Sequence, residues 1–210
     1  MGKSRAGLVL LVAIMVAGCT STFKGDVSSW HQMPPASGER YVIVPKDAGK
    51  EGSIEFAHYA EIVSQNLQRV GYRPAASTDS AELVVRIDYG VSDGRTEVRS
   101  YGSGFGYHGY YGYRPYYYGG WGYGYGRGYS DVRSYAVYAR RLEMEIAAPG
   151  AEKNLYESTV VSEGRSNRLQ ESMPYMVQAM FTDWPGPSGQ TRRVKLNLDD
   201  PTDAAKLSQY

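Results

Sequence analysis

The sequence predicts an α+β domain, a two-layer sandwich in which two helices cover one face of a mainly antiparallel sheet of about five strands. Three observations lead to this expectation. Several segments alternate apolar and polar residues, as strands with one buried and one solvated face do. Two other segments repeat apolar residues at spacings of three and four, which is typical of amphipathic helices. A hairpin between successive strands argues against a doubly wound parallel fold.

The first half of the domain is expected to run strand, helix, strand. Residues 41–45 form a short β-branched strand. Ser53 can cap a helix over about residues 54–70, which Gly71 ends. Residues 81–91 then alternate strictly, with their charged side chains on the polar face. The apolar stripe of the helix consists of Phe56, Ala60, Val63, Leu67 and Val70.

The second half begins with a long strand over residues 132–147. Its upstream and downstream apolar residues are out of phase, which predicts a β-bulge near Arg140 and Arg141. A turn at residues 149–151 leads into a strand over about 154–163, so the two strands make a hairpin. We expect both the Arg140–Arg141 pair and the Arg192–Arg193 pair to lie on the solvated faces of strands.

A second helix is expected over residues 172–184, with Pro174 tolerated in its first turn. A last strand follows over about 192–199, and residues 200–210 form a loosely packed tail. The apolar face of this helix comprises Met173, Met176, Val177, Met180 and Trp184, a pattern typical of core filling.

The N-terminus has the pattern of a secretory signal peptide. Lys3 and Arg5 precede an apolar run over residues 6–18, and Cys19, the single cysteine of the chain, follows it. The run is too short to span a membrane, which takes roughly 18 or more apolar residues. The absence of further cysteines argues against a disulfide framework.

Residues 16–19, Val-Ala-Gly-Cys, resemble the lipobox of bacterial lipoproteins. The resemblance implies cleavage between Gly18 and Cys19 and covalent lipid on Cys19, and we expect no other cofactor and no metal. Thr20, where an Asp would favour inner-membrane retention, implies an outer-membrane anchor facing the periplasm. Residues 1–18 are then the signal, 19–40 a lipidated N-terminus with a tether, and 41–199 the domain.

A Gly/Tyr-rich insertion over residues 92–131 interrupts the domain. From Tyr101 to Tyr129 it holds eleven tyrosines and eleven glycines, and its only charged residues are Arg114 and Arg127. Structureless loops longer than about 15 residues are uncommon in compact domains and are either functional or disordered. The segment is read as a replaceable mobile loop, as a self-association element, or as a surface that stacks on glycan rings or on an envelope partner. The candidate partner-binding residues are Tyr107, Tyr110, Tyr111, Tyr113, Arg114, Tyr116, Trp121, Tyr123, Tyr125 and Arg127.

Recognisable catalytic constellations are mostly absent from the sequence. The three histidines His31, His58 and His108 do not have metal-ligand spacing. His58 and Glu61 lie three apart on the first predicted helix, which is most simply a surface pair. No G-x-S-x-G turn occurs. The 23 basic and 22 acidic residues nearly cancel, which gives no global signal for nucleic acid, and we expect no nucleic-acid partner.

These features together resemble the bacterial lipoproteins of the domain of unknown function 4136 family. The resemblance rests on the lipobox, the strand at 41–45, the helix end at 67–72, the strand at 81–85, the Gly/Tyr insertion and the segment Phe-Thr-Asp-Trp-Pro at 181–185. It implies a periplasmic, lipid-anchored α+β domain with no assigned enzymatic activity. It supplies no catalytic residues.

The expected function is that of a non-enzymatic binding or structural module of the bacterial envelope. Lipid holds it at the membrane, and the Gly/Tyr insertion is its contact surface for an envelope protein or glycan. Two alternatives remain: an accessory subunit of an envelope assembly or transport complex, and a hydrolase of envelope glycans or peptides. The sequence leaves the oligomeric state open.

Overall fold

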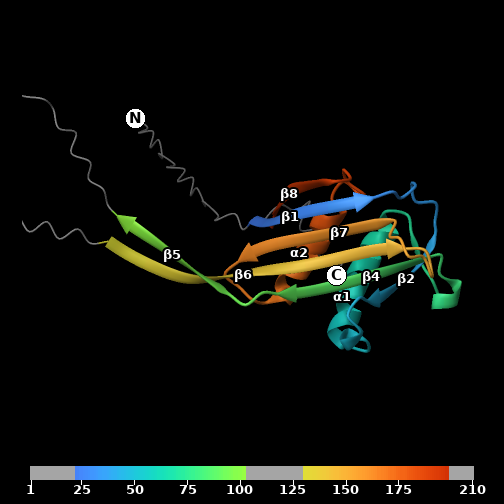
Figure 1. The fold of residues 1–210 in the computed structure, drawn as a ribbon, viewed down its shortest axis with the longest axis horizontal. Helices are drawn as coiled ribbons and strands as arrows, with labels where there is room; N and C mark the ends of the chain where they lie inside the picture. Colours follow the sequence, from blue (N-terminus) through green and yellow to red (C-terminus); the bar gives the residue numbers. More distant parts are fainter. Residues whose placement is uncertain (1–21, 103–129, 199–210) are drawn as a thin grey trace, which may run out of the picture.

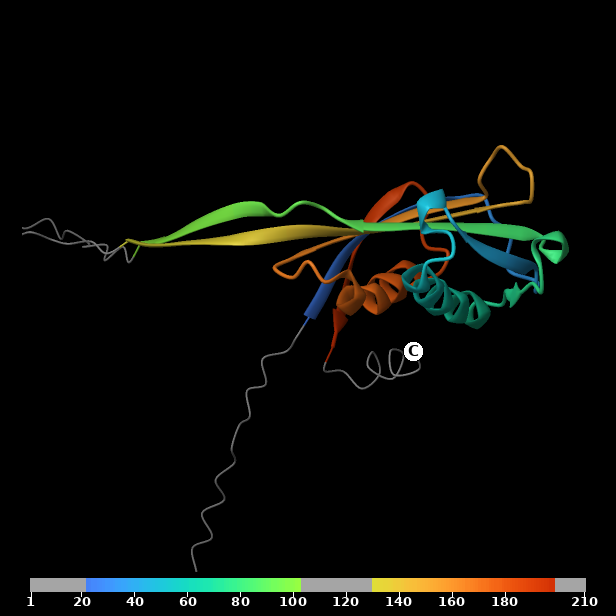
Figure 2. The same cartoon turned by 90° about the horizontal axis from the view of Figure 1, so that it is seen from below.

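The computed structural model describes residues 22–102 and 130–198, which form one sheet of eight strands packed against two α-helices. Both α-helices lie on the same side of the sheet (Figure 2). The predicted α+β class is confirmed. The sheet has more strands than the five or so expected, and it is mixed: mainly antiparallel, with parallel pairing of β2 to β3 and to β4.

The helical connection that follows β2 explains why the sheet is mixed (Figure 1). The spatial order of strands is β3-β2-β4-β6-β7-β1-β8, and β5 pairs with β6 outside this path. β2 runs parallel to β3 and β4 because α1 connects them as a crossover, whereas the other pairs are antiparallel. The bounds are β1 Thr22–His31, β2 Arg40–Pro45, α1 Ile54–Arg69, β3 Arg73–Pro74, β4 Leu83–Val91, β5 Arg95–Gly102, β6 Ser130–Ala147, β7 Tyr156–Gly164, α2 Leu169–Phe181 and β8 Gln190–Asn197.

Strand β1 shows that the tether expected over residues 19–40 is wrong for residues 22–31, which belong to the sheet. β1 lies inside the sheet, paired with β7 on one side and β8 on the other. Its side chains Phe23 and Val27 are buried in the core. The inward positions between and after them are Gly25 and Ser29. These small residues interrupt the apolar alternation, so the sequence pattern did not predict this strand.

The alternation of β4 and the hairpin of β6 and β7 are confirmed. Val85 and Ile87 of β4 are fully buried, whereas Arg86 and Asp88, which alternate with them, are only partly buried. Residues 138–146 of β6 pair with residues 156–164 of β7 in antiparallel register. Gly150 makes the turn with a φ of 73°, a left-handed conformation that favours glycine.

Helix α1 begins where Ser53 was expected to cap it. The Ser53 hydroxyl accepts a hydrogen bond from the Phe56 backbone N–H at 3.3 Å. Its buried face is rotated from the predicted stripe: Phe56 is only partly buried, whereas Tyr59 and Ile62 are buried. The large side chains of Tyr59 and Ile62 bury more apolar area than Ala60, which the stripe contained, and so they face the sheet.

Helix α2 begins earlier than expected, at Leu169, and ends at Phe181. Pro174 therefore lies in the helix interior rather than in its first turn. The predicted apolar face is confirmed, because its three methionines and Val177 have no exposed surface. Trp184 lies beyond the helix, where its ring packs 4.6 Å from that of Phe181 between centroids.

Strand β6 runs unbroken through the place where a bulge was predicted. Arg140 and Arg141 keep regular register with β7. The irregularity lies in the opposite neighbour, where Val91 of β4 pairs with Arg140 but Arg95 of β5 pairs with Val137. One extra residue is therefore accommodated between β4 and β5. The change of neighbour explains why the two halves of β6 differ in phase.

The Gly/Tyr insertion is shorter than residues 92–131. β5 and the start of β6 extend the sheet into it, with Arg95 opposite Val137 and Gly102 opposite Ser130. Residues 103–129 lie outside the described part of the chain. Within the described residues, no helix combines the length and apolarity needed to cross a membrane.

Candidate functional site

The β5–β6 hairpin forms an arm that leaves the body of the domain. We define the arm as residues 95–102 and 130–137, which pair only with each other. Figures 1 and 2 show it extending away from both helices. The side chain of Val98 on this arm is 63% exposed. Val137 at the base of the arm is buried, but no described residue of the arm belongs to the main hydrophobic cluster, and residues 103–129 connect its two strands.

Polar contacts hold the base of the arm to the body. The Arg95 guanidinium donates to both carboxylate oxygens of Glu163 on β7, at 3.0 and 2.9 Å, and to Glu97 at 3.1 Å. The Tyr135 hydroxyl donates to Glu97 at 3.0 Å. The Arg165 guanidinium lies 4.4 Å from the Tyr135 ring centroid, as in a cation–π contact. These contacts are exposed, so they orient the arm more than they stabilise the fold.

Gly94 lies where the arm meets the body. A Cβ at this position would lie 2.7 Å from the Tyr138 ring, closer than carbon atoms approach. The Ser92 hydroxyl accepts from the Ala139 backbone N–H at 3.0 Å, and the Ser92 N–H donates to the Ala139 carbonyl at 2.9 Å. The chain thus changes from β4 to β5 at a close, hydrogen-bonded contact with β6.

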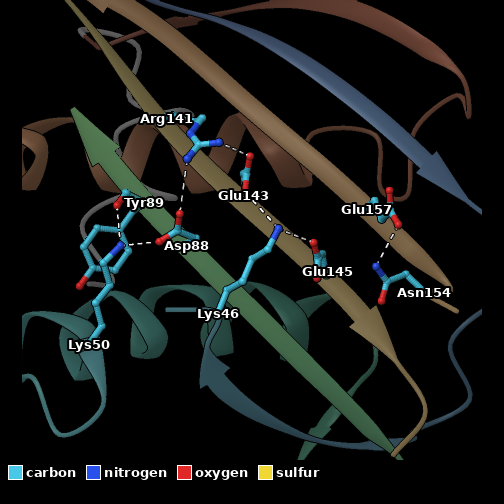
Figure 3. Close-up of polar contacts among 9 residues, drawn as sticks. All are labelled: Lys46, Lys50, Asp88, Tyr89, Arg141, Glu143, Glu145, Asn154 and Glu157. Carbon is cyan, nitrogen blue, oxygen red and sulfur yellow. Dashed lines mark hydrogen bonds and ion pairs between the residues drawn. The ribbon is translucent and has the colours of Figure 1, made fainter. Parts of the chain in front are cut away.

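The sheet face that lacks α-helices carries a ladder of ion pairs over β4 and β6 (Figure 3). The Lys46 ammonium group donates to Glu145 at 2.6 Å and to Glu143 at 3.4 Å. Arg141 pairs with Glu143 and lies 3.5 Å from Asp88. Positive and negative charges alternate and neutralise one another. This face is therefore solvated and offers no net field to a charged ligand.

Lys50 closes the ladder at the end of β4. Its ammonium group pairs with Asp88, donates to the Tyr89 carbonyl at 2.7 Å and lies 4.2 Å from the Tyr89 ring centroid. Burial alone would raise the pKa of Asp88, but the hydrogen bond and charge of Lys50 outweigh it. The pKa of Asp88 is consequently held below its usual value. The lowered pKa keeps Asp88 ionised and paired with Lys50.

Arg140 contradicts the expectation that both arginines of its pair face solvent. Its side chain points under α2 and the residue is 8% exposed, whereas Arg141 is exposed on the opposite face. The Arg140 guanidinium donates to the Ser172 hydroxyl at 2.8 Å, to the Ser162 hydroxyl at 3.3 Å and to the Ser162 carbonyl at 3.4 Å. Adjacent residues of a strand face opposite sides, so the sequence already required one of the two arginines to face inward.

A cavity of about 490 Å³ opens beside Arg140. Phe23, Tyr175 and Leu198 give it an apolar wall, and the rings of Phe23 and Tyr175 stack with centroids 5.7 Å apart. Thr22, Glu163 and Glu171 lie at its exposed rim. Its volume falls within the range of small-ligand pockets. The sequence signal that could have found this cavity was the doubled arginine in an alternating strand.

The sequence-predicted site residues fall mostly outside the described part of the chain. Gly18, Cys19 and all ten candidate partner-binding residues of the insertion lie there. His58 is exposed on α1 and makes no hydrogen bond to the residues that the structure describes, and Glu61 accepts from Gln65 instead. The described ranges contain no group of three or more metal-ligating side chains. His31 hydrogen-bonds the Gly186 carbonyl at 2.8 Å.

Comparison with known proteins identifies the family but not an activity. The model of a family described as "Domain of unknown function (DUF4136)" matches residues 25–186. No curated protein matches the chain. Similar solved structures include a PDZ domain protein from Parabacteroides distasonis, with 10% identity and a TM-score of 0.46. The match covers 85% of this chain and 40% of that chain.

Two further solved structures are covered almost completely by the match. A PelC dodecamer from Paraburkholderia phytofirmans has 12% identity and a TM-score of 0.38, over 75% of this chain and 95% of that chain. A DUF4136 family protein from Bacteroides thetaiotaomicron has 18% identity and a TM-score of 0.36, over 76% of this chain and 95% of that chain. Likeness at this level carries no argument about function.

Proposed function

We propose that this chain, which belongs to the DUF4136 family, is a lipoprotein of the bacterial envelope that acts as a non-enzymatic binding or structural module. Lipid on Cys19 anchors it in the outer membrane with the domain in the periplasm. The arm presents residues 103–129 to an envelope protein or glycan. The single observation that carries this proposal is the arm itself, a strand pair outside the core that bears the Gly/Tyr segment.

The arm has no use in the core that would explain it. An isolated pair of strands is marginally stable in water, and this one has neither a third strand nor a helix beside it. The segment at its end combines tyrosine, tryptophan and arginine without any acid. Such side chains supply flat, amphipathic contact area at low conformational cost. Presentation of this surface accounts for both the arm and its composition.

The arm also extends farther from the body of the domain than the short segment between Cys19 and β1 can. Only Thr20 and Ser21 separate Cys19 from β1, so at most about 11 Å of chain connects the lipid to the sheet. The domain would then lie close to the membrane surface. The eight residues of β5 span roughly 27 Å at strand rise, so the arm carries its end well beyond the body.

The anchor is tested by metabolic labelling with an alkyne fatty acid in the native host. We expect labelling of the wild type and its loss in Cys19→Ala, with the protein appearing in the soluble periplasmic fraction. Thr20→Ala is the matched control, because it alters the neighbouring residue and keeps the thiol. Labelling that persists in Cys19→Ala would reject the lipid anchor.

The arm is tested by replacing residues 103–129 with an Asn-Gly turn between Gly102 and Ser130, which are already opposite each other. We expect an unchanged urea midpoint and loss of the envelope molecules recovered by crosslinking in intact cells. A second variant keeps the length and changes the tyrosines and Trp121 to serine. Unchanged recovery in both variants would reject a contact role for the segment.

The two alternatives differ from this proposal in what the crosslinks would contain. An accessory subunit would be recovered with the same multi-protein assembly in every preparation, through the same arm. A hydrolase would require catalytic carboxylates in a cleft, and the two at the rim of the cavity beside Arg140, Glu163 and Glu171, are ion-paired with Arg95 and Arg168 instead.

A further inference from the structure

Arg140 is a buried cation without an anion. It is 8% exposed, and its three hydrogen bonds all go to serine oxygens. No carboxylate of the described residues forms an ion pair with it. Its neighbour Arg141, by contrast, pairs with both Asp88 and Glu143. Burial lowers the pKa of the Arg140 guanidinium, in keeping with its lack of a countercharge.

Such a residue is costly to the fold. A charge taken out of water without a partner loses several kcal/mol of hydration, which serine hydroxyls restore only in part. The structure also makes room for it: a Cβ on Gly164 would lie 2.5 Å from the Arg140 Nη2 atom. A guanidinium held in this way, at the expense of stability, is typical of a ligand site.

The polar groups around Arg140 are donors. The Ser162 and Ser172 hydroxyl oxygens both accept from Arg140, and their protons have no hydrogen-bond acceptor among the described residues. The two carboxylates at the rim are already occupied: Glu163 pairs with Arg95, and Glu171 pairs with Arg168 at 2.8 Å. A guanidinium and two free hydroxyl protons beside an open cavity fit an oxyanion.

The cavity lies at the end of the sheet from which the chain leads to Cys19. Thr22, three residues after Cys19, lines it, as does Lys24. Lys24 is directly opposite Lys195 in the β1–β8 pair, and neither lysine has an ion-pair partner in the described part of the chain. Like charges opposite each other in a sheet are destabilising. A negatively charged surface at this end would relieve their repulsion.

We propose that this cavity binds the phosphodiester of an anionic phospholipid headgroup, with Arg140, Ser162 and Ser172 as its ligands. The proposal rests on the proposed lipid anchor, which would hold Thr22 within about 11 Å of the bilayer surface. A phosphodiester carries one charge, matching one guanidinium, and its oxygens can accept from the two hydroxyls. The apolar wall of Phe23, Tyr175 and Leu198 accepts the glycerol carbons. Basic residues beside an anchor strengthen attachment to anionic membranes.

A soluble probe tests the cavity without any membrane. The full chain in a neutral detergent is titrated with glycerophosphoglycerol by isothermal calorimetry. We expect saturable binding that weakens by about tenfold or more in Arg140→Gln and is unchanged in Arg141→Gln, the adjacent arginine on the opposite face. Gly164→Ala keeps the charge but displaces the guanidinium, and should weaken binding as well.

Two further probes, inorganic phosphate and glucuronate, define the ligand. Inorganic phosphate shares the oxyanion chemistry, so binding weaker than that of glycerophosphoglycerol assigns the headgroup, and equal binding rejects it in favour of free phosphate. Tighter binding of glucuronate would reject it in favour of an acidic sugar. Equal affinity of wild type and Arg140→Gln for every probe would reject the site itself.

Thermal stability measured in nanodiscs tests headgroup binding separately from the proposed lipid anchor. In nanodiscs, phosphatidylglycerol should raise the thermal midpoint of the wild type above that in phosphatidylcholine, and it should not do so for Arg140→Met. Without anionic lipid, Arg140→Met should be as stable as the wild type or more so. A strong fall in its stability, with no response of the wild type to phosphatidylglycerol, would assign Arg140 a structural role. Loss of headgroup binding with intact Cys19 labelling would reject the cavity alone.

Discussion

The two halves of strand β6 share one backbone but lie in opposite environments. In the body, Leu142, Met144 and Ile146 alternate toward the helices and have no exposed surface. In the arm, the same strand pairs only with β5, where Val98 is 63% exposed. A strand can therefore continue far past its core, provided that one neighbour satisfies its hydrogen bonds. Local pairing forms the arm, and tertiary packing stabilises the body.

The largest expected difference between the halves is in hydrogen exchange. Amides of β7, inside the sheet, should exchange about 1,000-fold more slowly than those of β5, because they open only when the body unfolds. Exchange measured by mass spectrometry on peptides from 156–164 and 95–102 checks this. Comparable protection of the two strands would show that the arm belongs to the same cooperative unit as the body.

The second largest difference between the body and the arm should appear when an apolar side chain is truncated in each. Leu142→Ala should lower the free energy of unfolding by about 3 kcal/mol, because it leaves a cavity beneath the helices. Val98→Ala in the arm should change it by less than about 0.5 kcal/mol, since its side chain is mostly in water. Urea unfolding followed by circular dichroism measures both. A large effect of Val98→Ala would mean that a partner or the rest of the arm covers it.

The smallest effects concern the charges of the two regions. Asp88→Asn should cost about 1 kcal/mol at pH 7, because its contact with Lys50 is partly buried. The pKa of Asp88 is lowered in the folded state, so its contribution is present above the unfolded pKa of about 3.9 and is lost as the pH falls through the folded pKa. The stability difference between wild type and variant should therefore vanish in acid.

The arm provides the control for this measurement. Arg95→Gln, at the exposed base, should leave the urea midpoint unchanged at every pH. A pH-independent cost of Asp88→Asn would show instead that the substitution disturbs packing rather than an ion pair.

Sequence reasoning succeeded where short-range patterns decide structure. Ser53 begins α1 and residues 149–151 turn β6 into β7, because caps and turns depend on neighbouring residues. It missed β1, whose inward positions include Gly25 and Ser29. It also missed β5, in which none of residues 95–98, whose side chains are described, is buried.

Some of the candidate sites were also predicted from the sequence, and one was found only in the structure. The Gly/Tyr composition and the lipobox-like motif at Cys19 were readable from the sequence, and the proposed contact surface and anchor still rest on them. The cavity at Arg140 was not predicted: the alternation of β6 pointed to an inward Arg140, but the walls of the cavity come from β1, β6, β7 and α2, which lie far apart in the sequence. Arg140 shares the alternation of Leu142, Met144 and Ile146 and therefore faces inward, where the packing of α2 buries it.

The sequence by itself determined the local elements, the class of the fold and the chemistry carried at the end of the arm. The tertiary structure decided the order of strands, the insertion of β1 between β7 and β8, and the burial of Arg140. The physical reason is the range of the interactions. Val27 pairs with Val160 on one side and Arg192 on the other, far along the chain, and no local window of sequence contains those partners.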